Sequence, residues 1–128
     1  MFQEEDKVVY RELSYKITGF LFQAHKDLGR FRKEKQYGDY IEDLLKANKV
    51  DYQREYRIIT QEKVRDIADF IIDNKIILEL KAKDFIINED YDQIKRYLIT
   101  LNLKLGLLVN FRQTRVSVKR VLNSSYQA

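Results

Sequence analysis

The segment DFIIDNKIILELKA, residues 69–82, decides the fold, because it contains two short apolar runs separated by a polar turn. Such a pattern is typical of two neighbouring β-strands. Three ionisable residues, Asp69, Glu79 and Lys81, nevertheless fall inside these strands rather than at their ends. Either they face water at an edge of the sheet, or the sheet carries a functional site.

The length of the turn between the two strands determines whether the charged side chains lie together. A three-residue turn at 73–75 pairs Ile72 with Ile76 and, by continuation, Asp69 with Glu79. Directly opposed residues project from the same face of a sheet, with Cβ atoms about 5 Å apart. A two-residue turn would shift the register by one residue and separate the two carboxylates. We expect the three-residue turn, because it is a common hairpin and its asparagine tolerates a tight backbone.

The pattern of apolar residues predicts helices and further strands around this segment. Helical spacing extends over 13–28, with Gly29 as a stop, over 37–45 up to the KANKV segment at 46–50, and over 88–103, with Asn88 as N-cap. Strands are expected at 52–59, 64–72, 75–82, 105–111 and 115–122. The order ααβββαββ predicts an α/β (α+β) fold. The two strands joined through the third helix are expected to lie parallel.

Length and composition narrow the class of protein. The chain has 128 residues, which predicts one domain over 1–128 with a sizeable core. Its 24 lysines and arginines exceed its 20 acidic residues by four, a balance that permits an anionic partner. There is no cysteine, so disulfides and thiolate metal sites are excluded. The acidic start and the lack of a run of about 18 apolar residues predict no secretory signal and no membrane span. A cytoplasmic location is therefore expected.

Two opposed carboxylates in a sheet have a specific chemical meaning. Asp69 and Glu79 would repel each other, and their burial would be costly. A divalent cation removes both problems, and Mg²⁺ prefers one or two carboxylates together with water and phosphate oxygens. Lys81 would point to the same place and could position an attacking water or offset phosphate charge. The alternative is an ion cluster on a solvated face of the sheet.

The predicted helices add polar residues near their apolar stripes. Glu34 lies one turn before Tyr37, on the line that becomes the apolar stripe of the second helix. Gln93 and Tyr97 are four residues apart and share a face of the third helix. Each residue alone is compatible with ordinary amphipathic surface.

The ordered set as a whole resembles a known family. Its residues are Glu34-x-x-Tyr37, Ala68-Asp69, Glu79-x-Lys81, Gln93-x-x-x-Tyr97 and the apolar LGLLVNF. This order is similar to that of the GxxExxY protein family, a branch of the PD-(D/E)xK nuclease superfamily, from about residue 28 to 123. Two positions depart from the pattern: Phe31 stands where the family has its glycine, with Gly29 two residues earlier, and Ala68 replaces the proline of "PD".

The resemblance implies a restriction-endonuclease-like core, with a mixed central β-sheet flanked by helices, and a metal-dependent nuclease. It implies that Asp69, Glu79 and the backbone carbonyl of Leu80 ligate Mg²⁺, for which Mn²⁺ would substitute. Glu34 would bind the metal directly or through water.

The other motif residues take supporting roles by the same resemblance. Lys81 would orient or activate the water. Gln93 would orient the site, and Tyr97 would pack or hydrogen-bond beside it. The expected partner is nucleic acid, most simply DNA.

Cations near the proposed site in sequence could contact backbone phosphates. They are Lys33, Lys35, Arg54, Arg57, Lys83, Lys95 and Arg96. Two alternatives to a simple DNA nuclease remain open. One is a Holliday-junction-type resolvase, which implies a homodimer with two active sites on one junction. The other is a non-catalytic nucleic-acid-binding or regulatory module that retains the fold.

Overall fold

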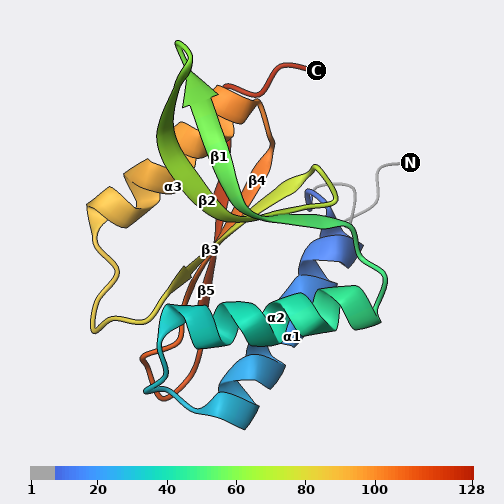
Figure 1. Ribbon diagram of the computed structural model, residues 1–128, viewed down its shortest axis with the longest axis vertical. Helices are drawn as coiled ribbons and strands as arrows, with labels where there is room; N and C mark the ends of the chain where they lie inside the picture. Colours follow the sequence, from blue (N-terminus) through green and yellow to red (C-terminus); the bar gives the residue numbers. More distant parts are fainter. Residues whose placement is uncertain (1–7) are drawn as a thin grey trace.

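The computed structural model describes residues 8–128, and its centre is a five-stranded sheet (Figure 1). The strands lie in the order β1-β2-β3-β4-β5. β3 and β4 pair in parallel, and all other neighbours pair antiparallel. The opposed strands on either side of the turn at 73–75 and the parallel pair, both predicted from the sequence, are confirmed. The strands are β1 (Tyr52–Thr60), β2 (Lys63–Ile72), β3 (Ile76–Lys81), β4 (Leu105–Asn110) and β5 (Ser117–Leu122).

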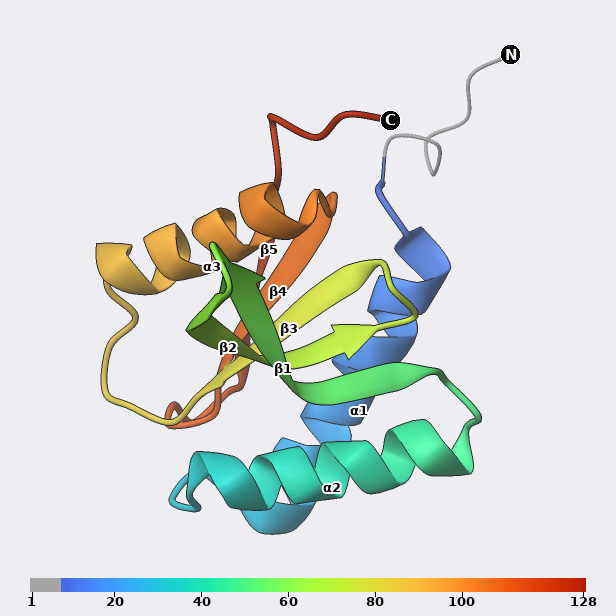
Figure 2. The same cartoon turned by 45° about the horizontal axis from the view of Figure 1, so that its top comes forward.

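Three helices cover the two faces of this sheet. α1 (Arg11–Leu28) and α2 (Glu34–Ala47) lie on one face, and α3 (Asn88–Leu101) lies on the other (Figure 2). α3 is the crossover that joins β3 to the parallel strand β4. The ααβββαββ order and the mixed sheet flanked by helices are therefore as predicted.

Alternation along the strands produces two separate apolar cores. In β3, Ile76, Leu78 and Leu80 pack on the side of α1 and α2, while Ile77 packs on the side of α3. Every residue of β4 is buried, as expected for a central strand with helices on both faces. β3 and β4 form the most enclosed part of the sheet, so a polar side chain placed there is held in a dry environment.

The turn between α1 and α2 determines where α2 begins. α1 ends at Gly29, whose φ of 78° is left-handed and suits glycine. The Tyr37 hydroxyl donates to the Gly29 carbonyl at 2.5 Å, and its ring stacks on Phe111 at 4.0 Å between centroids. These contacts hold the first turn of α2, and with it Glu34, against the end of β4.

The start of α3 differs by one residue from the sequence prediction. Asn88 is the first helical residue, and the N-cap position is Ile87. The Ile87 N–H donates to the Asp90 carboxylate at 2.9 Å. A side chain from within the first turn therefore satisfies the N–H of the N-cap residue.

No helix within residues 8–128 is both long enough and apolar enough to cross a bilayer. Residues 1–7, on which the expectation of no secretory signal partly rests, lie outside the described part of the chain.

Gly106 in β4 provides a test of how closely α3 packs on the sheet. A Cβ atom at this position would lie 2.5 Å from Cδ1 and 2.8 Å from Cγ1 of Ile94, which is fully buried. We predict that Gly106→Ala lowers the free energy of unfolding by about 1–3 kcal/mol through overpacking. Urea denaturation measures the change. Adding Ile94→Val, which removes Cδ1, should recover part of the loss. A Gly106→Ala protein as stable as the wild type would contradict the observed packing.

Candidate active site

The predicted carboxylates meet where β2 and β3 part. The turn has three residues, closed by the Lys75 N–H donating to the Ile72 carbonyl at 3.0 Å. Backbone pairing follows the predicted register, from Ile72 opposite Ile76 to Phe70 opposite Leu78. The sequence prediction about the turn is thus confirmed.

Beyond the Phe70–Leu78 pair, hydrogen bonds from the backbone to side chains replace the backbone ladder. The Leu80 N–H donates to Oδ2 of Asp69 at 2.7 Å, and the Asp69 N–H donates to Oε1 of Glu79 at 3.3 Å. Asp69 and Glu79 therefore lie together, but through side-chain bonds rather than as a simple cross-strand pair. The two strands remain joined while their backbones separate.

The local distortion extends across the sheet to β1. Ala68 and Ile71 are three residues apart, yet both pack on the α3 side, so alternation is broken at Asp69. Glu55 lies opposite Asp69, between the pairs Arg54–Phe70 and Tyr56–Ala68, with a left-handed φ of 54°. A glutamate with a left-handed backbone conformation is uncommon within a strand and marks a local constraint. Sequence reasoning missed Glu55, because alternation alone gives no sign of it.

Glu79 is the most enclosed ionisable group of the site, with 3% of its surface exposed. Burial, and next the neighbouring Asp69 carboxylate, raise the pKa of Glu79 to about 10. Without a cation, this carboxyl is therefore protonated at neutral pH. A divalent cation bound against it would reverse that preference.

Lys81 of β3 and Gln93 of α3 are brought together by the fold. Nζ of Lys81 donates to Oε1 of Gln93 at 3.1 Å and lies 3.9 Å from Oδ1 of Asp90. Asp90 is 7% exposed and also pairs with Nζ of Lys83 at 2.6 Å. Asp90 was not among the site residues predicted from the sequence. Its contacts with two lysines depend on the fold, so no local pattern could reveal them.

Glu34 and Tyr97 complete the set from two different helices. Glu34 is the first residue of α2 and lies at the solvent side of the site. Partial desolvation, and next the Asp69 charge, raise the pKa of Glu34, while Lys81 acts in the opposite direction. Tyr97 is buried on the α3 side, and desolvation followed by the Glu79 charge raises the pKa of its hydroxyl. Tyr97 therefore stays neutral beside the carboxylates.

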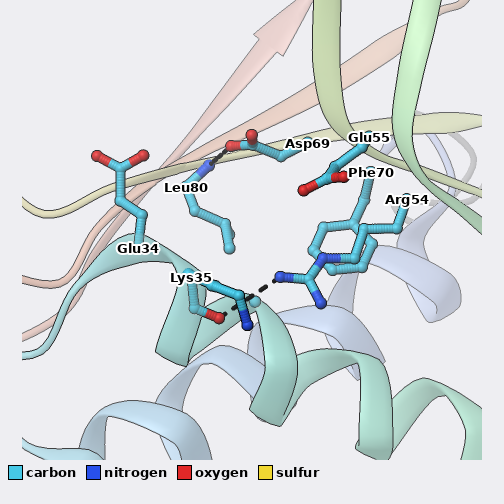
Figure 3. Close-up of a pocket in the computed structure, with 8 residues that line it drawn as sticks. Glu34, Lys35, Arg54, Glu55, Asp69, Phe70 and Leu80 are labelled. Atoms are coloured by element: carbon cyan, nitrogen blue, oxygen red, sulfur yellow. Dashed lines mark hydrogen bonds between the residues drawn. The ribbon is translucent and has the colours of Figure 1, made fainter.

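Two hollows give access to these groups. A pocket of about 210 Å³ lies between α2 and the split in the sheet, and the Glu34 and Asp69 carboxylates reach into it on either side of Leu80 (Figure 3). A second hollow, of about 440 Å³, lies beside α3. The first is lined by Glu34, Lys35, Gly38, Arg54, Glu55, Asp69, Phe70 and Leu80. The second is lined by Lys81, Glu89, Asp90, Asp92, Gln93 and Arg96.

The cations proposed for phosphate contact lie in different environments. Arg54 donates to Asp39 at 2.7 Å and to Glu42 at 3.1 Å, so carboxylates already offset its charge. Lys35 pairs with Asp39, Lys83 with Asp90 and Arg96 with Asp66. Lys33, Arg57 and Lys95 are exposed.

The fold and this geometry together define a class of protein. A mixed sheet with two carboxylates and a lysine where neighbouring strands part is a restriction-endonuclease-like arrangement. The family model of the PD-(D/E)XK nuclease superfamily matches residues 11–121, and the chain belongs to that superfamily. The match is compatible with the narrower GxxExxY assignment, which stays a prediction. No curated protein and no solved structure matched the chain in the comparisons.

The buried carboxyl makes a prediction about stability and pH. The unfolded chain ionises Glu79 near its ordinary pKa of 4.5, whereas the folded chain keeps it protonated up to about pH 10. Its contribution to stability is therefore complete below pH 4.5 and is lost as the pH rises toward 10. Glu79→Gln, which copies the neutral carboxyl, should raise the free energy of unfolding of the metal-free protein at pH 7 by about 2 kcal/mol.

Urea denaturation in the presence of a chelator measures this effect at pH 7 and near pH 4.5, where the difference should almost vanish. Glu89→Gln is the matched control, because Glu89 is exposed on α3. An equal or lower stability of Glu79→Gln at pH 7 would show that Glu79 is not held neutral.

Proposed function

We propose that this chain is a Mg²⁺-dependent nuclease that hydrolyses DNA phosphodiester bonds with an activated water. The observation that carries the proposal is the buried Glu79 carboxyl bonded to the backbone of Asp69, with Lys81 on the same strand. A carboxyl group enclosed beside a second carboxylate is costly to ionise in the absence of a cation. Catalytic function provides a reason to retain such a pair.

The donor set fits a hard divalent cation. Within residues 8–128, no three acidic or histidine side chains are grouped as a complete metal cage. Two carboxylates, Asp69 and Glu79, with the Leu80 carbonyl would instead leave room for water, which Mg²⁺ retains in most protein sites. Glu34, at the mouth of the pocket, would act through such a water. Nucleases of this superfamily generally use divalent metal ions, and Mn²⁺ is expected to substitute here.

The remaining residues position and stabilise the reacting groups. Gln93 accepts a hydrogen bond from Lys81 and thereby fixes the direction of the ammonium group. The Lys81 Nζ would donate to the attacking water or to a phosphate oxygen as negative charge develops. Asp69 is held by the Leu80 N–H, so its free oxygen has a defined direction. When bound, the cation would lower the pKa of its water and polarise the phosphate.

Cleavage assays test the catalytic assignment. We predict that Asp69→Asn and Lys81→Ala each reduce the rate of DNA cleavage at least ~100-fold, because each removes a group that acts in the transition state. Labelled single-stranded, duplex and branched DNA with Mg²⁺ or Mn²⁺ provide the measurement. Asp43→Asn and Lys119→Ala remove the same charges from exposed positions and should cut normally. Cleavage that survives in either active-site variant would contradict the proposal.

Metal binding should be linked to proton release. The raised pKa of Glu79 means that a cation must displace a proton at pH 7. The observed enthalpy of Mn²⁺ binding should therefore depend on the ionisation enthalpy of the buffer, and the affinity should rise up to about tenfold per pH unit. Calorimetric titration in two buffers measures both effects, and Glu79→Gln should abolish the proton release. Binding with no proton release would place the metal away from Glu79.

A further inference from the structure

We propose that Phe31 is a stacking platform for an unpaired base, so that the substrate of this site contains a single-stranded nucleic-acid segment. The direction of the strand, toward Asp69 and Lys81, rests on the function proposed above. The stacking itself does not, because it depends on the surface of three connecting segments. These segments, called the loop rim here, are residues 29–33, 82–87 and 111–116.

The loop rim lies at one end of the sheet, where β3 and β4 end (Figures 1 and 2). Arg30 and Arg112 join two of its segments reciprocally: Nε of Arg30 donates to the Arg112 carbonyl at 2.8 Å, and Nε of Arg112 donates to the Arg30 carbonyl at 3.1 Å. Gln113 donates to the Asp84 carbonyl at 2.5 Å, which links the segment 82–87 to the segment 111–116. Hydrogen bonds thus join the three segments of the rim to one another.

Phe31 projects from this hydrogen-bonded rim. It is 74% exposed, and its ring has guanidinium groups near it, with Cζ of Arg30 at 4.8 Å and Cζ of Arg112 at 5.8 Å from the centroid. A second phenylalanine, Phe85 on the adjoining segment, is 77% exposed. An isolated exposed apolar side chain needs no explanation. Two exposed rings on hydrogen-bonded segments are less easily dismissed, and the ring of Phe31, with its neighbouring arginines, is suited to a flat anionic ligand.

The charge of the molecule is concentrated on the same rim. Its six cations are Arg30, Arg32, Lys33, Lys83, Arg112 and Arg115, against the single carboxylate of Asp84. The rim therefore has a formal charge of +5, whereas the whole chain has +4, so the remainder is net negative by one. Lys83 is partly offset by Asp90 of α3. A polyanion would therefore be attracted to this end of the molecule.

The rim is continuous in sequence with the candidate active site. Phe31 lies three residues before Glu34, and Phe85 lies four residues after Lys81. Proteins that bind single strands combine basic surfaces with aromatic rings on which bases stack. In a duplex the base faces are already stacked, so an exposed ring can reach a base face only where the strand is unpaired or frayed. These features favour a single strand over an intact duplex.

Intrinsic fluorescence gives a direct test, because the chain contains no tryptophan. Phe31→Trp introduces a single rim reporter, and Tyr15→Trp introduces a control reporter at an 82% exposed position near the start of α1. The metal-free proteins are titrated with oligodeoxythymidylate and with a DNA duplex of equal length. We expect the single strand to quench the rim reporter strongly and the duplex to quench it less. The fluorescence of the control reporter should be unaffected by either ligand.

Substitution of the ring then separates stacking from charge. Phe31→Ala should weaken single-strand binding about 5- to 100-fold, the range of one base–aromatic stack, and change duplex binding less than about twofold. Phe31→Trp should retain the affinity, and Phe22→Ala, at another exposed phenylalanine, should have no effect. Thermal unfolding confirms that each variant is folded.

Three results would overturn the proposal: no binding to nucleic acid, a rim reporter that does not respond to saturating single strand, or equal losses for both ligands in Phe31→Ala. Because the titration contains no metal, the outcome is independent of cleavage. A protein whose rim reporter responds but which never cuts DNA would lose only the proposed nuclease activity. A protein that cuts DNA while its rim reporter stays unresponsive would lose only the stacking platform.

Discussion

One hydrogen bond determines the shape of the site, that from the Leu80 N–H to the Asp69 carboxylate. In an uninterrupted ladder, a backbone carbonyl of the neighbouring strand would accept this N–H. Because a side chain takes that place, β2 and β3 separate without leaving a buried donor unpaired. The separation opens the pocket against α2 and places Asp69 and Glu79 next to each other. Within the described residues, no buried side-chain nitrogen or oxygen lacks a partner, so the opening leaves no buried side-chain polar atom unpaired.

The surrounding sheet makes this arrangement tolerable. Keeping Glu79 protonated within β3 lowers the stability of the folded chain at neutral pH. Glu55, opposite Asp69, adopts a left-handed backbone conformation. Glu79 lies within the parallel β3–β4 pair, whose apolar residues are packed from both faces, and Glu55 lies on β1, on the other side of β2. The cores on the two sides of the sheet therefore fix the strands, and the local cost falls on a few residues. Such a division between a rigid frame and a strained site is expected where a site must hold charge.

The parts of the structure that follow local rules could be predicted from the sequence, and those that depend on distant contacts could not. The three-residue turn, the end of α1 at Gly29 and the parallel strands around α3 follow from turn chemistry, backbone freedom and connection length. The Glu79-x-Lys81 spacing places both residues on one face of a strand. Neither Glu55 nor Asp90 was identified. The backbone of Glu55 departs from regular strand geometry, and Asp90 meets lysines of β3 and of the segment after it only in the folded chain. The roles of the site residues stay predictions.

The distribution of charge shows why a list of cations near the motif in sequence was insufficient. Arg54 and Arg96 are close to motif residues along the chain, but carboxylates from α2 and β2 pair with them. A net excess of cations lies instead on the connections after β3 and β4 and before α2, which together contain six cations and one carboxylate. Parallel strands place their carboxyl ends at the same edge of a sheet, so the two connections that follow them must be neighbours. The stacking of Tyr37 on Phe111 brings the third connection to that edge. The topology that assembles Glu34, Lys81 and the end of β4 therefore also gathers the basic rim beside them. The proposed site for a charged polymer thus depends on the same parallel pair.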